Sequence, residues 1–494
     1  MQHIQTHPHA GHEHARWTKG VLIAVVAALL LAFLQTGVSQ LVAASLLIAV
    51  GAALSLLYAD AAIVATLLYL IFLGDIRRLV SRNAGLVSQD MLLVVAPVVI
   101  GVLFLRLLFE RKIRADTPLA KLVVALLCVM ALEIVNPAQG GLTVGVAGAL
   151  YYIVPLIWFW VGRSLPTEKI AGDLVRVFFP LLAALAAVLG LYQTFYGYLS
   201  FEAHWVRQQI AGGFAALIIN GSVVRAFSFF TSPSEYSLFL GLGLVCCAAP
   251  LVVGRKRLVT LLIPLLVWAL FLESVRAAVV LAAMAVLAMI SLTGRNSEQM
   301  FTRAFLAVVL GGGIMYFGLH RLEGMDSTDT RMETLKEHTV DGLLNPGESS
   351  ASGHLEIAVF GIKDGLKHPL GEGLGSTTMA ATKMGSHGGA GYENDVANMF
   401  ASLGVVGGLL YVVTILVALY TVFVIWRDRR SFVALATFGI LVSQLGYWLQ
   451  GGHYALVAIC WFLIGSVDRA GVNALAAAVA QPVPVRSGRA HPAY

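Results

Sequence analysis

Long apolar runs, separated by short polar segments, repeat along almost the whole chain. A helix needs about 20 apolar residues to cross a hydrocarbon layer roughly 30 Å thick. The runs that reach or approach this length lie at about 20–36, 40–57, 60–74, 91–108, 119–135, 144–162, 174–196, 236–252, 257–273, 275–293, 302–319, 398–425, 431–449 and 453–467. The pattern predicts an all-α, polytopic transmembrane bundle of about 14 spans, or 12 if 40–74 and 431–467 are tight hairpins.

Composition supports a membrane location. Of the 494 residues, 58% are hydrophobic and 12% are charged, whereas soluble domains are roughly 45–50% apolar and about 25% charged. A soluble protein of this size could not bury so much apolar surface. The composition therefore excludes a disordered chain, a disulfide scaffold and a simple cytosolic enzyme. The net charge of +6 is too small and too scattered to indicate nucleic acid binding.

Short basic segments between the apolar runs predict the orientation. Cytoplasmic loops carry an excess of Lys and Arg, and a cytoplasmic N-terminus puts six basic segments on that side. They lie at 110–114, 162–169, 254–257, 294–303 and 426–430 and in the C-terminal tail. The exception is the stretch 75–90, with Arg77, Arg78 and Arg82, which falls outside. Either this stretch is an amphipathic interfacial piece, or the early span count is wrong by one.

This orientation divides the chain into five parts. We expect a His-rich cytoplasmic tail (1–19), a transmembrane region (20–319) with an outer loop at 197–235, a large periplasmic loop (320–397), C-terminal transmembrane helices (398–467) and a cytoplasmic tail (468–494). Polar loops on a rigid scaffold are where chemistry usually occurs. The outer face is therefore the expected working surface.

The first outer loop contains Arg225, followed by aromatic residues and a Thr-Ser-Pro-Ser turn. A guanidinium group makes paired hydrogen bonds to phosphate oxygens, so Arg225 is a candidate for binding an anionic headgroup. An arginine that extends to lipid phosphates is an equally good interpretation. Arg207, in the same loop, is a secondary candidate for substrate contact.

Arg276 follows Glu273 between two apolar runs that have almost no loop between them. Three residues apart on one helical face, these two side chains can neutralise each other. That local ion pair is the simpler interpretation of the residues alone. The functional interpretation is a second cation that points into the same outer cavity as Arg225.

The large loop has a helix-like portion at 353–367, then a glycine-rich turn that begins at His368. Its glycines permit positive φ and a close approach of the backbone to a ligand. The Walker spacing is absent, so this turn is not a phosphate loop.

Three groups near the end of the large loop can act as a general base, namely Glu393, His387 and Asp395. Acids at the start of a helix also complement the helix dipole, which explains Glu393 and Asp395 equally well. Asn394 and His368 are secondary candidates for substrate contact.

Metal and cofactor motifs are not found in the sequence. The N-terminal tail carries five histidines, at positions 3, 7, 9, 12 and 14, without the framework of a structural metal site. The four cysteines lie in apolar runs without a Cys-x-x-Cys spacing. There is no EF-hand, nucleophile elbow or dinucleotide fingerprint. We therefore expect neither a metal nor a cofactor.

Four stretches together resemble the O-antigen ligase/polymerase family, whose members join lipid-linked sugar chains on the outer face of bacterial inner membranes. The stretches are the Arg225 loop up to Tyr236, the Glu-Ser-Val-Arg-Ala-Ala segment 273–278, the His-Pro-Leu-Gly-Glu-Gly-Leu-Gly turn within 362–375, and the segment 393–407. The match covers roughly residues 220–425. No single motif is specific, but their order along one chain is fairly specific.

The resemblance implies a bundle similar to GT-C-type glycosyltransferases, in the bacterial inner membrane, with a periplasmic active site. It implies a metal-independent enzyme whose donor is a polyprenyl-pyrophosphate-linked oligosaccharide. Membrane lipids, a flippase and chain-length or export proteins are the other implied partners. Arg225 and Arg276 would then hold the donor pyrophosphate, and Glu393 would be the base, with His387 or Asp395 in reserve.

One departure from the family bears on the reaction. Family ligases carry a His beside the Asn of the closing motif, whereas this chain has Glu393-Asn394 there and His387 six residues earlier. We therefore favour polymerisation of an exopolysaccharide or O-antigen repeat over ligation to a lipid core. The expected reaction is a single-displacement, inverting transfer.

Two other functions compete with this one. A transporter or flippase would place its site near the bilayer midplane, on broken helices within internal repeats. The two halves show no convincing repeat, and the polar residues are concentrated in an outer loop. A non-catalytic scaffold of an export complex would lack a cavity shared by Arg225, Arg276 and the segment 387–395.

Overall fold

The computed structural model describes most of the chain. The described residues are 40–84, 90–164, 168–211, 217–219, 223–255, 257–324, 329–344, 350–384 and 391–480. The first expected span, 20–36, and the candidate base His387 lie outside these residues.

The described part is almost entirely helical. The main helices are α2 (Gln40–Leu57), α3 (Ala59–Ile71), α4 (Leu73–Ala84), α5 (Leu92–Phe109), α6 (Pro118–Glu133), α7 (Leu142–Ser164), α8 (Glu168–Asp173), α9 (Phe179–Tyr196), α10 (Ser200–Ala211), α11 (Pro233–Val252), α12 (Ile263–Leu272), α13 (Arg276–Leu292), α14 (Ser297–Glu323), α15 (Thr330–Leu344), α16 (Ser350–Lys367), α17 (Met379–Met384), α18 (Asp395–Arg429), α19 (Phe432–Ser443) and α20 (Tyr454–Ala480). Two-residue strands, β1 (Ile218–Ile219) and β2 (Val223–Val224), pair antiparallel.

Eight helices within the described residues are long and apolar enough to cross a membrane. The bent pair of α3 and the first part of α4, which meet at 64°, would be a ninth span. The apolar helices at 258–272, 276–292 and 432–443 are shorter. The predicted all-α architecture is confirmed, and these helices are consistent with the predicted multi-pass bundle, whereas the count of 12 to 14 spans stays a prediction.

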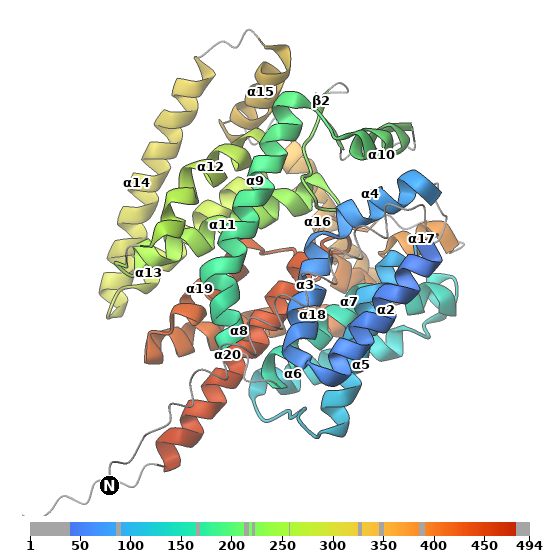
Figure 1. The fold of residues 1–494 in the computed structure, drawn as a ribbon. Coiled ribbons are helices and arrows are strands. Elements are labelled where there is room, and N and C mark those ends of the chain that lie inside the picture. The colour runs from blue at the N-terminus through green and yellow to red at the C-terminus, as the bar shows by residue number, and fades with distance from the viewer. Residues whose placement is uncertain are drawn as a thin grey trace, which may run out of the picture.

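The bundle has two distinct ends. In Figure 1, α10, α15 and β2 lie at one end, which we call the loop end. The helix α9 runs from there to the opposite end, near α8. We call this the basic end because Arg176, just before α9, and Arg255, just after α11, line one pocket with Lys169 of α8. A helix rises 1.5 Å per residue, so the 20 residues of α11 separate the two ends by about 30 Å.

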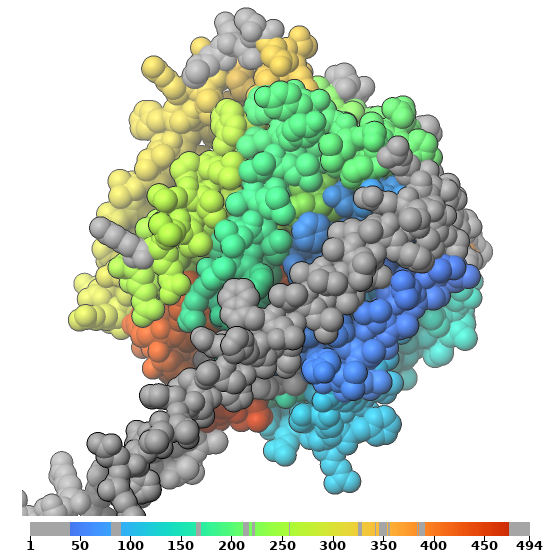
Figure 2. Space-filling view, in the orientation of Figure 1, coloured from blue at the N-terminus to red at the C-terminus, as the bar shows by residue number. Residues whose placement is uncertain are grey.

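Helix α14 differs from the other spans because it stands at the side of the bundle. It packs mainly on α13, and its 18-residue apolar window has no buried residue. Its large side chains, among them Phe305, Leu310 and Ile314, are exposed, and α14 forms one edge of the filled surface in Figure 2. Such an all-round apolar helix is expected to face lipid.

The centre of the bundle is held by close contacts between helix backbones. A Cβ on Gly162 of α7 would lie 2.2 Å from the Phe462 carbonyl oxygen, and one on Gly465 of α20 would lie 2.0 Å from that of Phe159. Small residues let transmembrane helices approach closely, so that dispersion contacts can replace the missing hydrophobic drive. These two glycines therefore allow the close packing of α7 against α20 at the centre of the bundle.

Arg78, one of the exceptions to the charge pattern, has a structural role. Its side chain is buried, donates hydrogen bonds to the carbonyl oxygens of Ser228 and Phe230, and forms an ion pair with Asp75. Its guanidinium also lies over the Phe227 ring, 4.0 Å from the centroid. Arg78 therefore holds the loop that carries Arg225.

Candidate functional site

The segment after Arg225 is fixed by buried polar contacts. The Gln193 side chain accepts hydrogen bonds from the Phe227 and Ser228 amides at 3.0 and 2.7 Å, and donates to Glu202 at 2.8 Å. Ser228 has a φ of 50°, a left-handed conformation that is uncommon for residues other than glycine. Such strain persists only where the surroundings enforce it. The loop is therefore rigid at the point where it presents Arg225.

Arg225 itself is placed by backbone hydrogen bonds. Its amide donates to the Leu217 carbonyl at 2.8 Å, and the Tyr198 hydroxyl donates to the Arg225 carbonyl at 2.9 Å. The side chain is half-buried and reaches toward α15, where Arg225 Nη2 lies 3.5 Å from His338 Nε2. The first outer loop and the large loop therefore meet at this arginine.

Arg276 reaches the same helix from the turn between α12 and α13. Ser274, with a φ of 61°, turns the chain sharply between α12 and α13. Its hydroxyl donates to the Leu335 carbonyl at 3.0 Å and lies 2.7 Å from Thr339 Oγ1 on α15. The Arg276 side chain packs against Gly342, where a Cβ would lie 1.8 Å from Nη1. A side chain at position 342 would therefore have to displace this guanidinium.

We call the group at this point the arginine cluster; its members are Arg225, Arg276, Arg331, Glu273 and His338. Arg331, on α15, donates to the Val224 carbonyl at 3.0 Å. Among the described residues, buried Arg225 Nε, Arg331 Nε and Glu273 Oε1 have no hydrogen-bond partner. Buried polar atoms are usually paired, so three unpaired atoms in one cluster indicate a place for a polar ligand.

Charges within the cluster shift each other's pKa. Burial raises the pKa of Glu273 well above its usual range, and the charges of Arg225 and Arg331 oppose this rise. Burial also lowers the pKa of Arg225, as does the charge of Arg276. The two guanidinium groups are thus close enough to repel each other, which an anionic ligand between them would relieve.

His338 is expected to be neutral at pH 7. Burial, together with the charges of Arg276 and Arg225, lowers its pKa to about 4. The unfolded chain has an ordinary His pKa of about 6.5, so below that pH the unfolded state binds a proton that the folded state does not. Stability is therefore lost as the pH falls from about 6.5 to about 4.

The pH dependence gives a testable expectation for His338. In thermal melts of the detergent-solubilised protein, His338→Gln should lose less stability than the wild type between pH 7 and pH 4.5. His320→Gln, at an exposed histidine of α14, should follow the wild-type curve. Equal pH dependence in the wild type and His338→Gln would show that His338 does not titrate in this way.

Two of the candidate bases, Glu393 and Asp395, belong to a second group of contacts, at the start of α18. Asn394 caps this helix by accepting from the Val396 amide at 2.9 Å. Asp395 is fully buried, and its Oδ2 accepts from the Tyr411 hydroxyl at 2.7 Å and from the Trp448 and Leu449 amides at 2.6 and 3.2 Å. This geometry favours an anchoring role for Asp395.

Glu393 is the exposed acid of this group. Burial raises the pKa of the Tyr447 phenol, and the charges of Glu393 and Asp395 raise it further. Glu393 is therefore close enough to Tyr447 to act on it electrostatically. Of the three candidate bases, Glu393 is thus open to solvent and Asp395 is buried, while His387 lies outside the described residues.

The non-helical segment 444–453 connects this group to the Arg225 loop. The Gly446 carbonyl accepts from the Asp395 amide at 2.9 Å. Near the other end of the segment, Thr231 Oγ1 lies within hydrogen-bond distance of the Gly452 carbonyl, at 3.0 Å, and of Glu235 Oε2, at 2.6 Å. The start of α18 and the end of the Arg225 loop are therefore fastened to one turn.

The glycine-rich turn packs against protein backbone. Gly371 and Gly373 have positive φ values of 82° and 97°, and the amides of Glu372 and Gly373 donate to carbonyls of α18 at 3.0 and 3.1 Å. Gly404, at the kink of α18, would place a Cβ 2.2 Å from the Pro369 carbonyl. The close approach that the glycines were expected to give a ligand is therefore made to α18.

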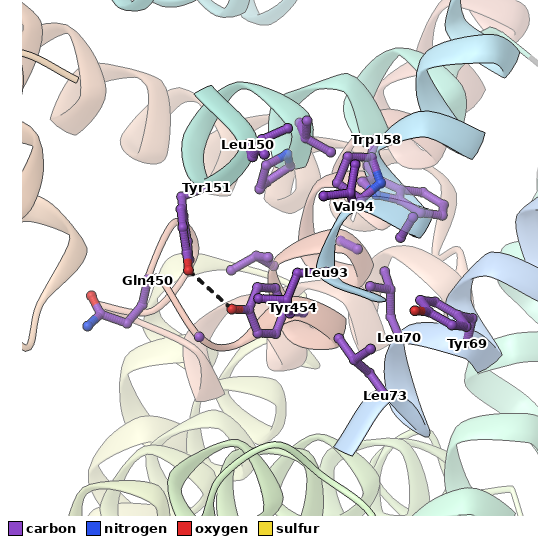
Figure 3. Close-up of a pocket in the computed structure, with 18 of the residues that line it drawn as sticks. Tyr69, Leu70, Leu73, Leu93, Val94, Leu150, Tyr151, Trp158, Gln450 and Tyr454 are labelled. Carbon is purple, nitrogen blue, oxygen red and sulfur yellow. Dashed lines mark hydrogen bonds between the residues drawn. The ribbon is translucent and has the colours of Figure 1, made fainter. Parts of the chain in front are cut away.

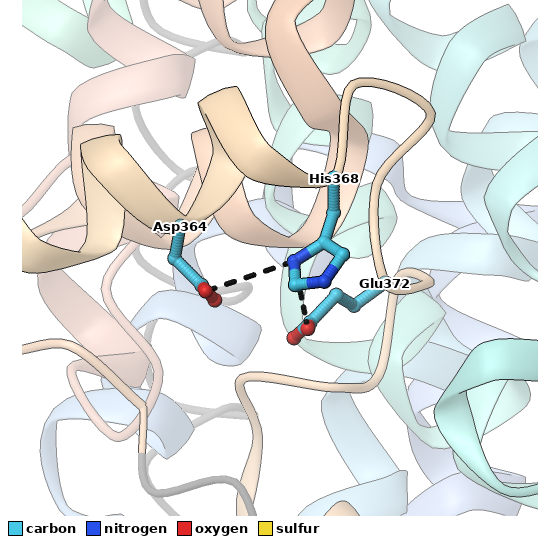
Figure 4. A group of neighbouring side chains, drawn as sticks. All are labelled: Asp364, His368 and Glu372. Atoms are coloured by element: carbon cyan, nitrogen blue, oxygen red, sulfur yellow. Dashed lines mark ion pairs between the residues drawn. The ribbon is translucent and has the colours of Figure 1, made fainter.

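His368 lies at the end of α16, between two carboxylates (Figure 4). Its Nδ1 is 3.6 Å from Asp364 Oδ1 and 3.2 Å from Glu372 Oε1. The ligand atoms of these three residues lie within 4.8 Å of one another, so they could hold a metal ion. Asp364 also accepts from the Tyr392 hydroxyl at 3.0 Å, which links this group to the start of α18.

Arg207 lies on an exposed position of α10. The structure therefore brings Arg225 and Arg276 together, places Asn394, Asp395 and Glu393 on a second group of contacts, and leaves Arg207 on the surface of the loop end.

An apolar cavity of about 190 Å³ opens between α3, α5, α7 and α20 (Figure 3). Its lining includes Leu93, Trp158 and Tyr454, and the Tyr454 hydroxyl donates to that of Tyr151 at 3.4 Å. Gly452, which accepts from Thr231, also lines it. The cavity therefore extends to the turn that fastens the Arg225 loop.

Arg331 and His338 are site residues that were not predicted from the sequence. Both lie on α15 with the contact residues Leu335, Thr339 and Gly342. Spacings of three, four and seven residues place side chains on one helical face. This spacing was the available signal, but nothing in it indicates that this face meets Arg225.

Comparison with protein-family models, with curated proteins and with solved structures finds no match to this chain.

Proposed function

We propose that this protein is an inner-membrane glycosyltransferase that polymerises or ligates a polyprenyl-pyrophosphate-linked oligosaccharide on the periplasmic face. Polymerisation of an exopolysaccharide or O-antigen repeat is the preferred reaction. The proposal includes a fold like that of GT-C-type glycosyltransferases and a relationship to the O-antigen ligase/polymerase family.

The observation that carries the proposal is the arginine cluster. Arg225 and Arg276 come from different loops and converge on His338, and the buried Nε of Arg225 has no partner among the described residues. Guanidinium groups bind phosphate oxygens through paired, charge-assisted hydrogen bonds. A pyrophosphate has several anionic oxygens. It therefore suits two converging guanidinium groups better than a ligand with a single carboxylate does.

The position of the cluster favours a transferase over a transporter. The cluster lies at the loop end, where α13 begins at Arg276 and where α15 contacts Arg225. Transporters place substrate sites near the membrane midplane instead.

The reaction we propose is a single displacement at the anomeric carbon. An acceptor sugar hydroxyl forms the new C–O bond as the bond from that carbon to the pyrophosphate oxygen breaks, and the polyprenyl pyrophosphate leaves with the electron pair. Arg225 and Arg276 stabilise the charge that develops on the leaving group. Glu393 takes the hydroxyl proton as general base.

A polyprenyl chain also needs an apolar surface. The cavity between α3, α5, α7 and α20 is lined mainly by apolar side chains and reaches the turn next to the Arg225 loop. In our proposal it accommodates part of the hydrocarbon chain, while the phosphates lie at the arginine cluster.

The direct test is incubation of the purified protein with a polyprenyl-pyrophosphate-linked oligosaccharide. The proposal expects longer sugar chains and an equivalent amount of free polyprenyl pyrophosphate. No lengthening and no released polyprenyl pyrophosphate, with protein that is folded by thermal melt, would contradict it.

A further inference from the structure

A second cationic site lies at the basic end, across the bundle from the arginine cluster. A pocket of about 890 Å³ opens there among α8, α18, α19, α20 and the segments flanking α9 and α11. Its lining includes six basic residues and no Asp or Glu among the described residues; the six are Lys169, Arg176, Arg255, Arg429, Arg430 and Arg469. These cations come from four separate stretches of the chain, at 169–176, 255, 429–430 and 469, and line one hollow.

Several of these side chains are held in place by groups other than carboxylates. Arg429 Nη2 donates to the Gly471 carbonyl at 2.8 Å. The guanidinium of Arg176 lies 5.4 Å from the Phe432 ring centroid, and that of Arg430 lies 5.1 Å from that of Trp426. Carbonyls and ring faces orient a guanidinium but leave its full positive charge.

One carboxylate approaches the pocket from outside its lining. Arg469 Nη1 lies 3.8 Å from Asp116 Oδ2, but Asp116 also pairs with Arg163. Within the described part of the chain, Arg469 is the one of the six basic residues that pairs with a carboxylate, so the pocket keeps a net positive charge.

The start of α19 adds to this charge. Arg430 ends α18 with a left-handed φ of 52°, and Ser431 caps α19 by accepting from the Ala434 amide at 3.4 Å. Ser431, Phe432 and Val433 line the pocket, so the N-terminus of a 12-residue helix opens into it. Helix N-termini attract anions through their free N–H groups and their dipole.

We propose that this pocket binds a phosphate-bearing anion, whose phosphate groups contact Arg176, Arg255 and the guanidinium groups at the end of α18. The site is independent of the glycosyltransferase proposal, because it lies about 30 Å away along α11. Guanidinium forks match phosphate oxygens in geometry and charge. Basic pockets between transmembrane helices bind the headgroups of acidic phospholipids, and a soluble phosphate compound offers the same chemistry.

The test compares two pairs of substitutions that remove equal charge from the same end of the bundle. The pocket variant is Arg176→Gln with Arg255→Gln. The control is Arg295→Gln with Arg427→Gln, at exposed arginines that do not line the pocket. Full-length protein in phosphatidylcholine nanodiscs is titrated in one arm with cardiolipin and in the other with sodium pyrophosphate, and binding is read by native mass spectrometry.

The pocket variant should bind cardiolipin, pyrophosphate or both at least about tenfold more weakly than the wild type, while the control changes by less than about twofold. A tenfold change corresponds to about 1.4 kcal/mol. A loss in the cardiolipin arm alone identifies a lipid, and a loss in the pyrophosphate arm alone identifies a soluble phosphate. Equal losses in both variants, or no binding of either ligand by the wild type, would overturn the proposal.

A measurement on the wild type covers the case in which the pocket variant does not fold. Cardiolipin with a photoreactive group near its phosphates, or a photoreactive diphosphate, should label peptides from 426–433 and 466–473. Labelling confined to other peptides, such as 295–303, would overturn the proposal.

Discussion

Replacing Arg225 or Arg276 with Ala is expected to slow chain extension by about 100- to 1,000-fold, the loss typical of removing one group that stabilises transition-state charge. Both guanidinium groups converge on α15, so either substitution removes one of the two proposed ligands of the pyrophosphate. The measurement is the rate of polyprenyl pyrophosphate release by purified protein at equal concentration.

Arg321→Ala is the matched control for this pair. Arg321 lies at the loop end of α14 and is exposed, so its loss removes the same charge from the same end of the bundle. The control should keep at least half of the wild-type rate. Wild-type rates in both Arg225→Ala and Arg276→Ala would end the assignment of the arginine cluster as the donor site.

Asp395→Ala is expected to destabilise the protein by about 3–5 kcal/mol, as removal of one partner from a buried charged network does. Three donors, from Tyr411, Trp448 and Leu449, would lose their acceptor. Because the segment 444–453 also contacts Thr231, the Arg225 loop should loosen as well. The measurement is the melting temperature of the detergent-solubilised protein.

Glu393→Ala serves as the comparison for Asp395→Ala. Glu393 is exposed, so its loss should leave the melting temperature within about 2 °C of the wild type, since surface substitutions usually change stability by about 0.5 kcal/mol or less. The proposed base role predicts that this variant is nonetheless inactive. A stable but inactive Asp395→Ala, together with an active Glu393→Ala, would move the base to Asp395.

The apolar pattern predicted the architecture well because lipid imposes a simple rule. A span must be helical and apolar over its length, so the runs in the sequence became helices in the described residues. The pattern overestimated what length alone supports for 431–449, since α19 ends at Ser443 and the chain continues as the turn that holds Asp395. Apolar residues such as Trp448 and Leu449 belong to that buried turn.

The candidate site was harder to predict because its contacts join residues far apart in the chain. Arg225 and His338 are 113 positions apart, and no local periodicity encodes such a meeting. The same limit applies to Arg78, which holds a backbone segment 150 positions away. Motif chemistry named the two arginines as candidates, but only the fold brings them to one helix and adds Glu273, Arg331 and His338 around them.

The glycine-rich turn illustrates a different limit. Positive φ and close backbone approach were expected, and both occur at Gly371 and Gly373. Glycine allows close approach to any neighbour, however, and here the neighbour is α18. Sequence reasoning could predict the conformation but could not distinguish a ligand from another helix.

The most direct test of the central claim is a double-substitution cycle for binding of polyprenyl pyrophosphate to the wild type, Arg225→Ala, Arg276→Ala and the double variant. Groups that share one ligand show coupling of about 0.5–3 kcal/mol, whereas distant, independent groups add within about 0.5 kcal/mol. We predict that each single variant binds at least about tenfold more weakly and that the double variant loses clearly less than the product of the two single losses. Losses that simply multiply, or single variants that bind as the wild type does, would contradict a shared pyrophosphate site.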